Sequence, residues 1–403
     1  MSSLERKLEL KGVDNPKLPL FLGGMGADIS NMELAVAVGI AGGVAVRSSV
    51  AMDVITPNSE WFKDEGISVK LDNAGRMGIA EAVELELKYT REKIEGATGE
   101  QAAVGINIMC ALERDYEESV RGAVNGGANV IISGAGLPLD LPKLVEKYAG
   151  KNHNISLVPI VSSARAAKII CNRWESNHHC KPDLIYVEGS KAGGHLGWHY
   201  ETTQEPDFIE KYDVARLITE VEDWMEKSGN DVPLIAAGGL KSYEGIEKML
   251  KNPNVVAVSV ATPLALTQES GFKNEYILQL AKNTVSISDK SPCGYPFVVA
   301  DDGPLVVAQK NDNDAFPICP GLIATRGMSY DPEKIKCLGY VWPISKGKDC
   351  PAFDSENKQC SAITKGNVGV PLITLGYNGE ELLKRVAKEG LPTAAQRMEE
   401  LIG

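Results

Sequence analysis

The sequence lacks any apolar run of the roughly 18 residues that a membrane-spanning helix needs. Its first eleven residues alternate charged side chains with leucines and contain no apolar segment of signal-peptide length. Both absences predict a cytoplasmic protein that does not bind membranes. Positive charge is also in deficit, since 42 Lys and Arg stand against 54 Asp and Glu, a net charge of −12. An acidic protein of this kind is not expected to bind nucleic acid.

The eight cysteines show no spacing typical of a metal site or a disulfide framework. No Cys-x-x-Cys occurs and no export signal precedes them, so reduced thiols are expected. Four of them lie at wide intervals near the C-terminus, at Cys319, Cys337, Cys350 and Cys360. No metal is predicted, although the sequence leaves open whether these four thiols bind zinc or an iron–sulfur cluster.

Neither the glycine motif of dinucleotide-binding folds nor a P-loop is present. Glycine is nevertheless abundant, with 40 residues, and it gathers at the ends of apolar runs. Glycine allows a ligand to approach the backbone closely, so this pattern favours backbone-mediated ligand binding.

Short apolar runs alternate with amphipathic segments over about 250 residues, which is typical of parallel strands joined by helices. The runs lie at 19–22, 44–46, 102–109, 129–132, 157–161, 183–187, 232–236 and 255–260. Eight such units predict an α/β protein with a (βα)8 TIM barrel, whose active site lies at the C-terminal ends of the strands. A doubly wound open sheet is the alternative. Ser30, Ser163 and Ser242 are expected to cap helices.

The alternation of strands and helices, and where it ends, predicts that the chain is divided into two parts. Residues 1–288 are expected to form the barrel, with an irregular stretch at 50–74 and a last helix near 275–282. Residues 289–403 are expected to form a Cys-containing C-terminal appendage. That appendage consists of a lid or packing segment over the barrel mouth and closing helices at 379–389 and 393–402.

The stretch from Tyr186 to Gly197 carries the clearest sign of chemistry. A short apolar run ends at Val187, and the sequence Glu-Gly-Ser-Lys-Ala-Gly-Gly-His follows and ends at His195. The unperturbed pKa of histidine lies near neutrality, so His195 is suited to act as a general acid or base. Without the flanking glycines, a lone histidine would more often be structural.

Two later loops are candidates for binding a phosphate group. In TIM barrels, a phosphate commonly binds the loops after the last two strands together with a nearby helix N-terminus. Here those loops contain Gly238, Gly239, Ser259, Val260, Ala261 and Thr262. The alternative is that the two glycines only make a tight turn.

A phosphate held there, beside a flat surface lined by glycine, suits flavin mononucleotide (FMN). The flavin ring is then expected over the ends of the first and third runs, near Gly24, Met25, Gly26 and Asn107. The Asn107 amide offers both a donor and an acceptor to the polar edge of a flavin. The alternative for Asn107 is a turn residue at the end of a strand.

Five segments together resemble the nitronate monooxygenase family, formerly called 2-nitropropane dioxygenases: residues 20–26, 107, 188–195, 236–239 and 259–262. Flavin-type enoyl-acyl-carrier-protein reductases share this framework. The resemblance implies a TIM barrel that binds FMN non-covalently, with His195 near the flavin and the substrate. It also implies flavin contacts at Met25, Asn107, Glu188, Gly193, Gly238 or Gly239 and the 259–262 loop. The neighbouring Gly24, Gly26, Ala192 and Gly194 complete the predicted cofactor site.

Three positions depart from the family pattern. Ala261 stands where the family usually has glycine, so the approach to a phosphate is slightly more crowded. Glu188 replaces a frequent glutamine and leans toward the enoyl-reductase branch. Lys191 replaces a residue that is often acidic. These departures leave the flavin prediction in place and bear on the substrate.

The sequence thus predicts an FMN-dependent oxidoreductase with a small-molecule substrate, a nitronate monooxygenase that oxidises alkyl nitronates with O2. The alternative is an NAD(P)H-dependent enoyl-thioester reductase that uses FMN. A third class is a non-catalytic barrel that binds a phosphate or a nucleotide. Whether the protein forms a homo-oligomer stays open.

Overall fold

A computed structural model of the chain describes residues 8–14, 16–72, 76–272, 274, 277, 284–289, 295–301, 353–354, 359–360, 375–377 and 379–403. Across these ranges, no helix combines the length and the apolarity that crossing a membrane requires.

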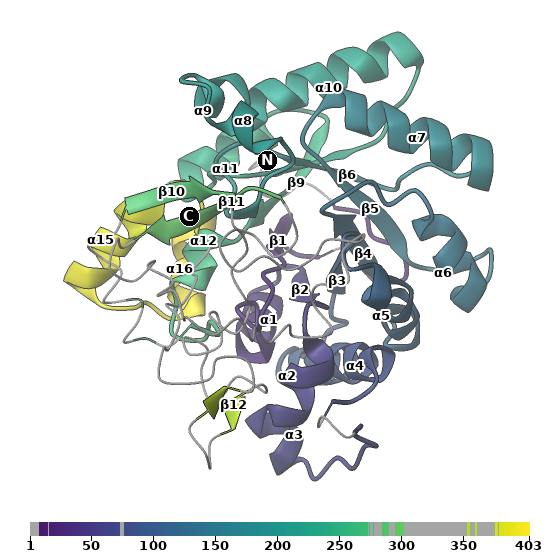
Figure 1. Ribbon diagram of the computed structural model, residues 1–403, viewed down its shortest axis with the longest axis vertical. Coiled ribbons are helices and arrows are strands. Elements are labelled where there is room, and N and C mark those ends of the chain that lie inside the picture. Colours follow the sequence, from purple (N-terminus) through teal and green to yellow (C-terminus); the bar gives the residue numbers. More distant parts are fainter. Residues whose placement is uncertain are drawn as a thin grey trace.

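Eight parallel strands form one closed sheet, in the order β1-β9-β8-β6-β5-β4-β3-β2 (Figure 1). They are β1 (Leu20–Leu22), β2 (Ala45–Ser48), β3 (Val104–Met109), β4 (Val130–Gly134), β5 (Ser156–Val161), β6 (Ile185–Glu188), β8 (Leu234–Ala237) and β9 (Val255–Val260). The barrel closes where the Val44 N–H donates to the Leu20 carbonyl (2.8 Å) and the Leu22 N–H donates to the Val44 carbonyl (3.1 Å). All eight predicted strands and the predicted TIM barrel are confirmed. The open sheet is excluded.

A ring of helices surrounds the barrel, and each covers a buried strand face. The ring consists of α1 (Met32–Ile40), α4 (Ile79–Thr98), α5 (Glu113–Asn125), α6 (Leu141–Ala149), α7 (Ala164–His178), α10 (Val214–Ser228), α11 (Tyr243–Leu250) and α16 (Ala394–Ile402). Only the four-residue helix α12 (Thr262–Ala265) directly follows β9. The place between α1 and α11 is instead filled by α16, from the end of the chain.

The C-terminal helices therefore return to the barrel. The apolar face of α16 joins the main core through Ala394, Met398 and Leu401. The preceding helix α15 (Gly379–Glu389) packs on α12 (Figure 1, yellow and green). Both closing helices are confirmed. The division of the chain at residues 288 and 289 stays a prediction, and α16 lies on its C-terminal side.

Two local predictions are wrong. Within the predicted irregular stretch at 50–74, residues 52–58 and 60–64 instead form α2 (Met52–Asn58) and α3 (Glu60–Asp64), while residues 65–72 contain no helix or strand. Pro57 interrupts the helical pattern of the sequence, and burial of Met52 and Ile55 overrides that local signal. Ser30 does not cap α1, since the side chain of Asn31 accepts from the Leu34 N–H (3.0 Å) in its place. The predicted helix near 275–282 lies largely outside the described residues.

The other two predicted caps are confirmed. The Ser163 hydroxyl accepts from the Ala166 N–H (3.2 Å) and begins α7. The Ser242 hydroxyl accepts from the Gly245 N–H (3.3 Å) and begins α11. Each cap provides an acceptor for one of the N–H groups that the first turn of a helix leaves unpaired.

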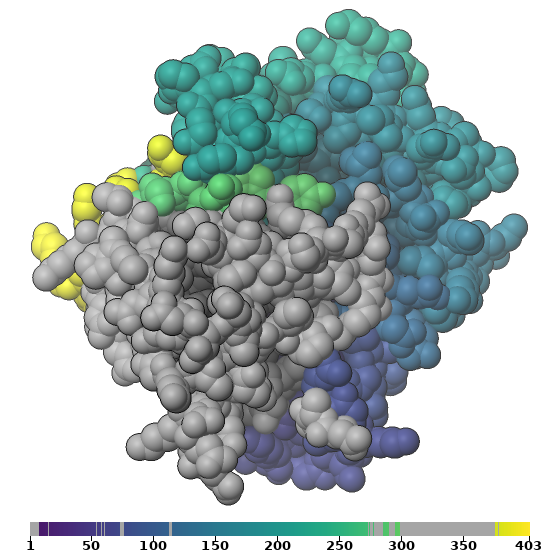
Figure 2. All heavy atoms as spheres, in the orientation of Figure 1, coloured from purple at the N-terminus to yellow at the C-terminus, as the bar shows by residue number. Residues whose placement is uncertain are grey.

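A second, antiparallel sheet lies at the C-terminal end of the barrel, in the order β10-β11-β7. Its strands are β10 (Thr284–Ser288), β11 (Phe297–Asp301) and β7 (Gly194–His195). A small apolar cluster of Ala192, Leu196, Phe208 and Val298 joins this sheet to α9 (Phe208–Lys211), just after α8 (Tyr200–Thr203). Figure 2 shows the green strands directly beside this teal segment.

Little of the predicted cysteine tail is described. Cys319, Cys337 and Cys350 lie outside the described residues, and Cys360 belongs to β13 (Gln359–Cys360), which pairs with β12 (Phe353–Asp354). Within the described part of the chain, no group of three His, Cys, Asp or Glu side chains is placed to hold a metal ion.

Candidate functional site

Two adjoining hollows lie at the C-terminal ends of the barrel strands. They share Glu188, Gly193, Ala261 and Thr262. We name them the glycine hollow, beside the ends of β8 and β9, and the apolar hollow, beside the ends of β1 and β3. Because the C-terminal ends of the strands hold the active site in this fold, the two hollows form the candidate site.

The glycine hollow is built from loop backbone. Its lining residues are Tyr186, Glu188, Lys191, Ala192, Gly193, Ala237, Gly238, Gly239, Leu240, Lys241, Ser259, Ala261, Thr262, Pro263, Gly376, Gly379 and Leu382. Gly238 has φ +101°, which side-chain-bearing residues rarely adopt, and a Cβ there would lie 3.0 Å from the Gly189 carbonyl oxygen. The tight loop therefore requires glycine at this position.

A polar group in the glycine hollow lacks a partner. The Ser259 hydroxyl is buried and makes no hydrogen bond with any described residue. The side chain of Tyr186 neighbours it, but the two hydroxyls do not meet in hydrogen-bond geometry. An unpaired buried hydroxyl is costly, so its position at a hollow indicates a polar ligand group.

The C-terminal segment closes one side of the glycine hollow. The Gly376 N–H donates to the Thr262 hydroxyl (2.8 Å) across 114 positions of sequence. The Tyr377 N–H donates to the Lys191 carbonyl (3.2 Å). Helix α15 then begins at Gly379, on the wall of the hollow. The positive end of a helix dipole thus lies next to the glycine loops, which favours a negatively charged ligand group.

The two lysines on the glycine hollow are both paired. The Lys191 ammonium lies 2.6 Å from the Asp213 carboxylate, and Lys241 forms an ion pair with Glu381 of α15. Asp213 also caps α10 by accepting from the Ala215 N–H (3.1 Å). The lysine at 191, one of the departures from the family pattern, is therefore neutralised by a neighbouring helix cap.

The apolar hollow has a different character. Its lining residues are Gly24, Met25, Gly26, Ala27, Ile29, Ser48, Val50, Asn107, Met109, Leu112, Gly134, Ala135, Ile160, Glu188, Gly193, Gly194, His195, Ala261, Thr262, Phe272 and Phe297. Aliphatic and aromatic side chains dominate, and His195 and Glu188 are the ionisable ones among these described residues. Such a surface accepts an uncharged ring or alkyl chain.

Close packing fixes the polar floor of the apolar hollow. A Cβ on Gly24 would lie 2.3 Å from the Cβ of Asn107, so glycine is needed for the β1 loop to lie against that side chain. A Cβ on Gly23 would lie 2.7 Å from the methyl group of Ala261. Ala261 is another departure from the family pattern. Its methyl group fits because Gly23 has no side chain.

The position of His195 is set by the second sheet. His195 pairs with Phe297 of β11, and the two rings stack with centroids 5.8 Å apart at 29°. The following Leu196 N–H donates to the Pro296 carbonyl (2.7 Å). Burial lowers the pKa of His195 to about 4. The imidazole is therefore neutral at physiological pH.

Glu188 lies where the two hollows meet, at the end of β6. Burial raises the pKa of Glu188 to about 8. Its carboxyl group has no cationic partner within the described ranges, so no positive charge there counteracts the effect of burial on its pKa. Glu188 is thus a neutral hydrogen-bond donor at pH 7.

Fourteen of the fifteen predicted site residues line the two hollows. The exception is Val260, which is buried in the barrel core, although its carbonyl accepts from the Gly23 N–H (2.8 Å). Sequence reasoning expected a C-terminal segment over the barrel mouth but did not single out Gly376 and Gly379 as site residues. It also missed Phe297 behind His195. Nothing local marks these residues, because they come from segments far along the chain.

Comparison with known proteins agrees with this architecture. A family model described as nitronate monooxygenase matches residues 9–287. The structure is similar to a nitroalkane oxidase from Streptomyces ansochromogenes, with a TM-score of 0.56, 15% identity, and coverage of 99% of this chain and 96% of that one. It is also similar to a FabK variant from Thermotoga maritima, with a TM-score of 0.56, 16% identity, and coverage of 99% and 92%. At such identities these likenesses concern the fold alone. A search of curated proteins found no match.

Proposed function

Because this chain belongs to the nitronate monooxygenase family, we propose that it is an FMN-dependent oxidoreductase that oxidises alkyl nitronates with O2. The observation that supports this most directly is the position of His195. It lies neutral on the wall of an apolar hollow that adjoins a glycine-built hollow suited to a phosphate.

The residues of the glycine hollow fit the phosphate end of FMN. The buried Ser259 hydroxyl needs a partner, and Gly238 leaves the backbone bare where an anion would approach. The N-terminus of α15 adds the favourable end of a helix dipole. Ser259, Gly238, Gly239 and Thr262 would therefore hold the phosphate. Gly24, Met25 and Asn107 would face the ring.

The protein's own contribution to the chemistry is positional. FMN, when bound, supplies the electron transfer between substrate and oxidant. His195 would accept the α-proton of a nitroalkane or hold the nitro group through its ring nitrogen. Phe297 stacks on the imidazole and keeps its plane in place. The aliphatic lining of the apolar hollow would hold the alkyl chain and keep water away while the proton moves to His195.

The second candidate is an NAD(P)H-dependent enoyl-thioester reductase, and Glu188 is the observation that favours it. Glutamate at this position leans toward the reductase branch, and burial keeps its carboxyl group protonated at pH 7. In that reaction, His195 would assist protonation of the substrate or stabilise a developing enolate.

The test is a pair of anaerobic reductions of the purified FMN-loaded protein. Loss of the flavin absorbance on adding an alkyl nitronate, with no loss on adding NADH, is the expected result. Loss with NADH alone would reject nitronate oxidation and favour the reductase. A colourless protein that takes up no FMN would reject both reactions and leave a binding barrel of another kind.

Glu188 predicts a pH dependence of cofactor affinity. FMN brings negative charge and removes water, so binding favours the neutral carboxyl group and raises its pKa further above about 8. FMN affinity is therefore expected to fall as the pH rises through 8. Flavin fluorescence titrations from pH 6 to 9.5 measure this fall. In Glu188→Gln, which cannot ionise, that fall should be absent, and a fall of equal size would exclude Glu188 as its source.

A further inference from the structure

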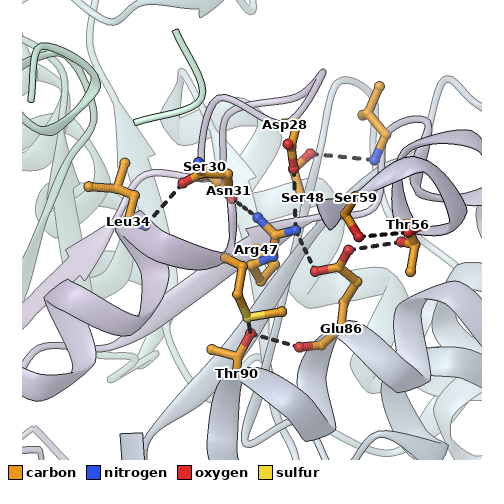
Figure 3. A network of polar contacts seen from close by, with 12 residues as sticks. Asp28, Ser30, Asn31, Leu34, Arg47, Ser48, Thr56, Ser59, Glu86 and Thr90 are labelled. Carbon is orange, nitrogen blue, oxygen red and sulfur yellow. Dashed lines mark hydrogen bonds and ion pairs between the residues drawn. The ribbon is translucent and has the colours of Figure 1, made fainter. Parts of the chain in front are cut away.

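A buried charge network lies behind the loop that follows β1 (Figure 3). At its centre is Arg47, at the end of β2, whose side chain is 2% exposed. One guanidinium nitrogen lies 2.5 Å from a carboxylate oxygen of Glu86, on α4, which is itself fully buried. The other oxygen of that carboxylate accepts from the Thr56 hydroxyl (2.8 Å). The guanidinium is thus anchored from the helix side of the barrel.

The same guanidinium also reaches the loop itself. It donates to the Ser30 carbonyl, and it lies 3.4 Å from a carboxylate oxygen of Asp28. Although burial opposes it, the carboxylates of Glu86 and Asp28 raise the pKa of Arg47 above its ordinary value. A permanently charged side chain therefore joins α4 and β2 to the loop after β1.

Ser30 passes this anchoring on to Met25. Its hydroxyl accepts from the Met25 N–H (3.1 Å) and donates to the Met25 carbonyl (3.0 Å). This explains why Ser30 does not cap α1: its hydroxyl closes the loop instead. Met25 and its neighbour Gly24 line the apolar hollow. Two hydrogen-bonded steps therefore separate the guanidinium of Arg47 from the surface that would meet the flavin ring.

The loop needs such an anchor because its backbone is strained. Ala27 has φ +54° and Asp28 has φ +64°, so two consecutive residues with side chains occupy the left-handed region. Residues other than glycine persist there only where surrounding contacts hold them, and such residues cluster at functional sites. Here the contacts from Arg47 fall on Asp28, which belongs to the strained pair, and on Ser30, two residues further on.

A purely stabilising role would leave this arrangement unexplained. Replacing a buried ion pair by well-packed apolar residues is often neutral or favourable for stability. What Arg47 provides, and an apolar side chain does not, is a set of directed contacts with a strained loop. We propose that Arg47 is a positioning residue, which acts through Ser30 to hold Met25 and Gly24 in the conformation that receives the flavin ring. This inference rests on the proposed FMN site.

The test compares FMN affinity in the full-length protein and three variants. Ser30→Ala removes the two hydrogen bonds between the Ser30 hydroxyl and Met25 and keeps the one from the Ser30 N–H to the Met25 carbonyl (3.3 Å). Arg47→Lys removes the directed guanidinium contacts. Arg397→Lys is the matched control: Arg397 is also 2% exposed and paired with a glutamate (2.6 Å to Glu400), but it lies on α16 and lines neither hollow. Flavin fluorescence titration gives each dissociation constant, and far-ultraviolet circular dichroism verifies folding.

Ser30→Ala and Arg47→Lys are expected to bind FMN on the order of 10-fold more weakly, as they would if the loop held its binding conformation about a tenth of the time. Arg397→Lys should bind like the wild type. The visible circular dichroism of FMN at saturation should also change in the first two variants alone. If Arg47→Lys does not fold, Ser30→Ala decides.

Three results would overturn the inference. Wild-type affinity in Ser30→Ala and in any folded Arg47→Lys would do so while leaving the proposed function intact. An equal loss of affinity in Arg397→Lys would show that general destabilisation is the cause. A wild-type protein that binds no FMN would remove the proposed function as well.

Discussion

Replacing His195 by asparagine is expected to lower turnover by about 10²–10⁴-fold while FMN stays bound, because general acid–base catalysis contributes about this much. The imidazole is neutral on the wall of the apolar hollow. Glu188 is the other ionisable side chain among the described residues there, and its pKa, raised to about 8, leaves it protonated at neutral pH. Asparagine keeps a polar side chain of similar reach. Steady-state turnover with a nitroalkane, whose α-proton His195 would accept, measures the expected loss, and FMN content per protein shows whether the cofactor stays bound.

The control for this prediction is His199→Asn. His199 is exposed and lines neither hollow, so its replacement should leave turnover unchanged. In the wild type, the neutral imidazole is the active form, and its pKa is lowered to about 4. Turnover should therefore show no loss assignable to His195 until the pH falls toward 4. Full turnover in His195→Asn would remove this residue from the chemistry.

Replacing Glu86 by glutamine is expected to lower the free energy of unfolding by about 3–5 kcal/mol, because removing one partner of a buried ion pair leaves the other charge buried and unpaired. The Arg47 guanidinium cannot reach water, and the carboxylate of Glu86 lies 2.5 Å away on a helix with no exposure at that position. Asp28, at 3.4 Å, is the more distant carboxylate and compensates only weakly. Urea denaturation followed by circular dichroism measures the loss.

Glu84→Gln is the matched control on the same helix. Glu84 pairs with Lys88 at 2.6 Å, but both side chains are substantially exposed. An exposed pair at this helical spacing contributes roughly 0.3–0.5 kcal/mol. Equal losses in the two variants would mean that Arg47 finds another partner or water when Glu86 is replaced. The burial argument for the network would then fail.

Much of the barrel could be predicted because its signals are local. A strand buried on both faces must be apolar along its whole length, and a parallel strand must be followed by a crossover, so the eight runs stand out. The glycines at 24, 193 and 238 could also be read from the sequence, since each lies at or soon after the end of an apolar run, although the groups that approach them closely lie far along the chain. These features require only neighbouring residues to be recognised.

Prediction failed where a distant segment decides the structure. Ser30 has the residue type of a helix cap, but its hydroxyl bonds Met25 instead, and its carbonyl accepts from Arg47. Residues 52–58 lack a helical pattern because of Pro57, yet packing on α4 makes them a helix. In each case the free energy of a tertiary contact exceeded that of the local preference, which is small for a single residue.

The sequence by itself determined the eight strands, the glycine loops at their ends and a histidine in that setting, since periodicity and residue type report burial and backbone freedom directly. Only the tertiary structure decided what surrounds them. It pairs His195 with Phe297, brings Gly376 and α15 to the glycine hollow, and fills the ring of helices with α16. The physical reason is that pairing between segments more than a hundred residues apart depends on three-dimensional packing, which leaves no periodic trace in either segment.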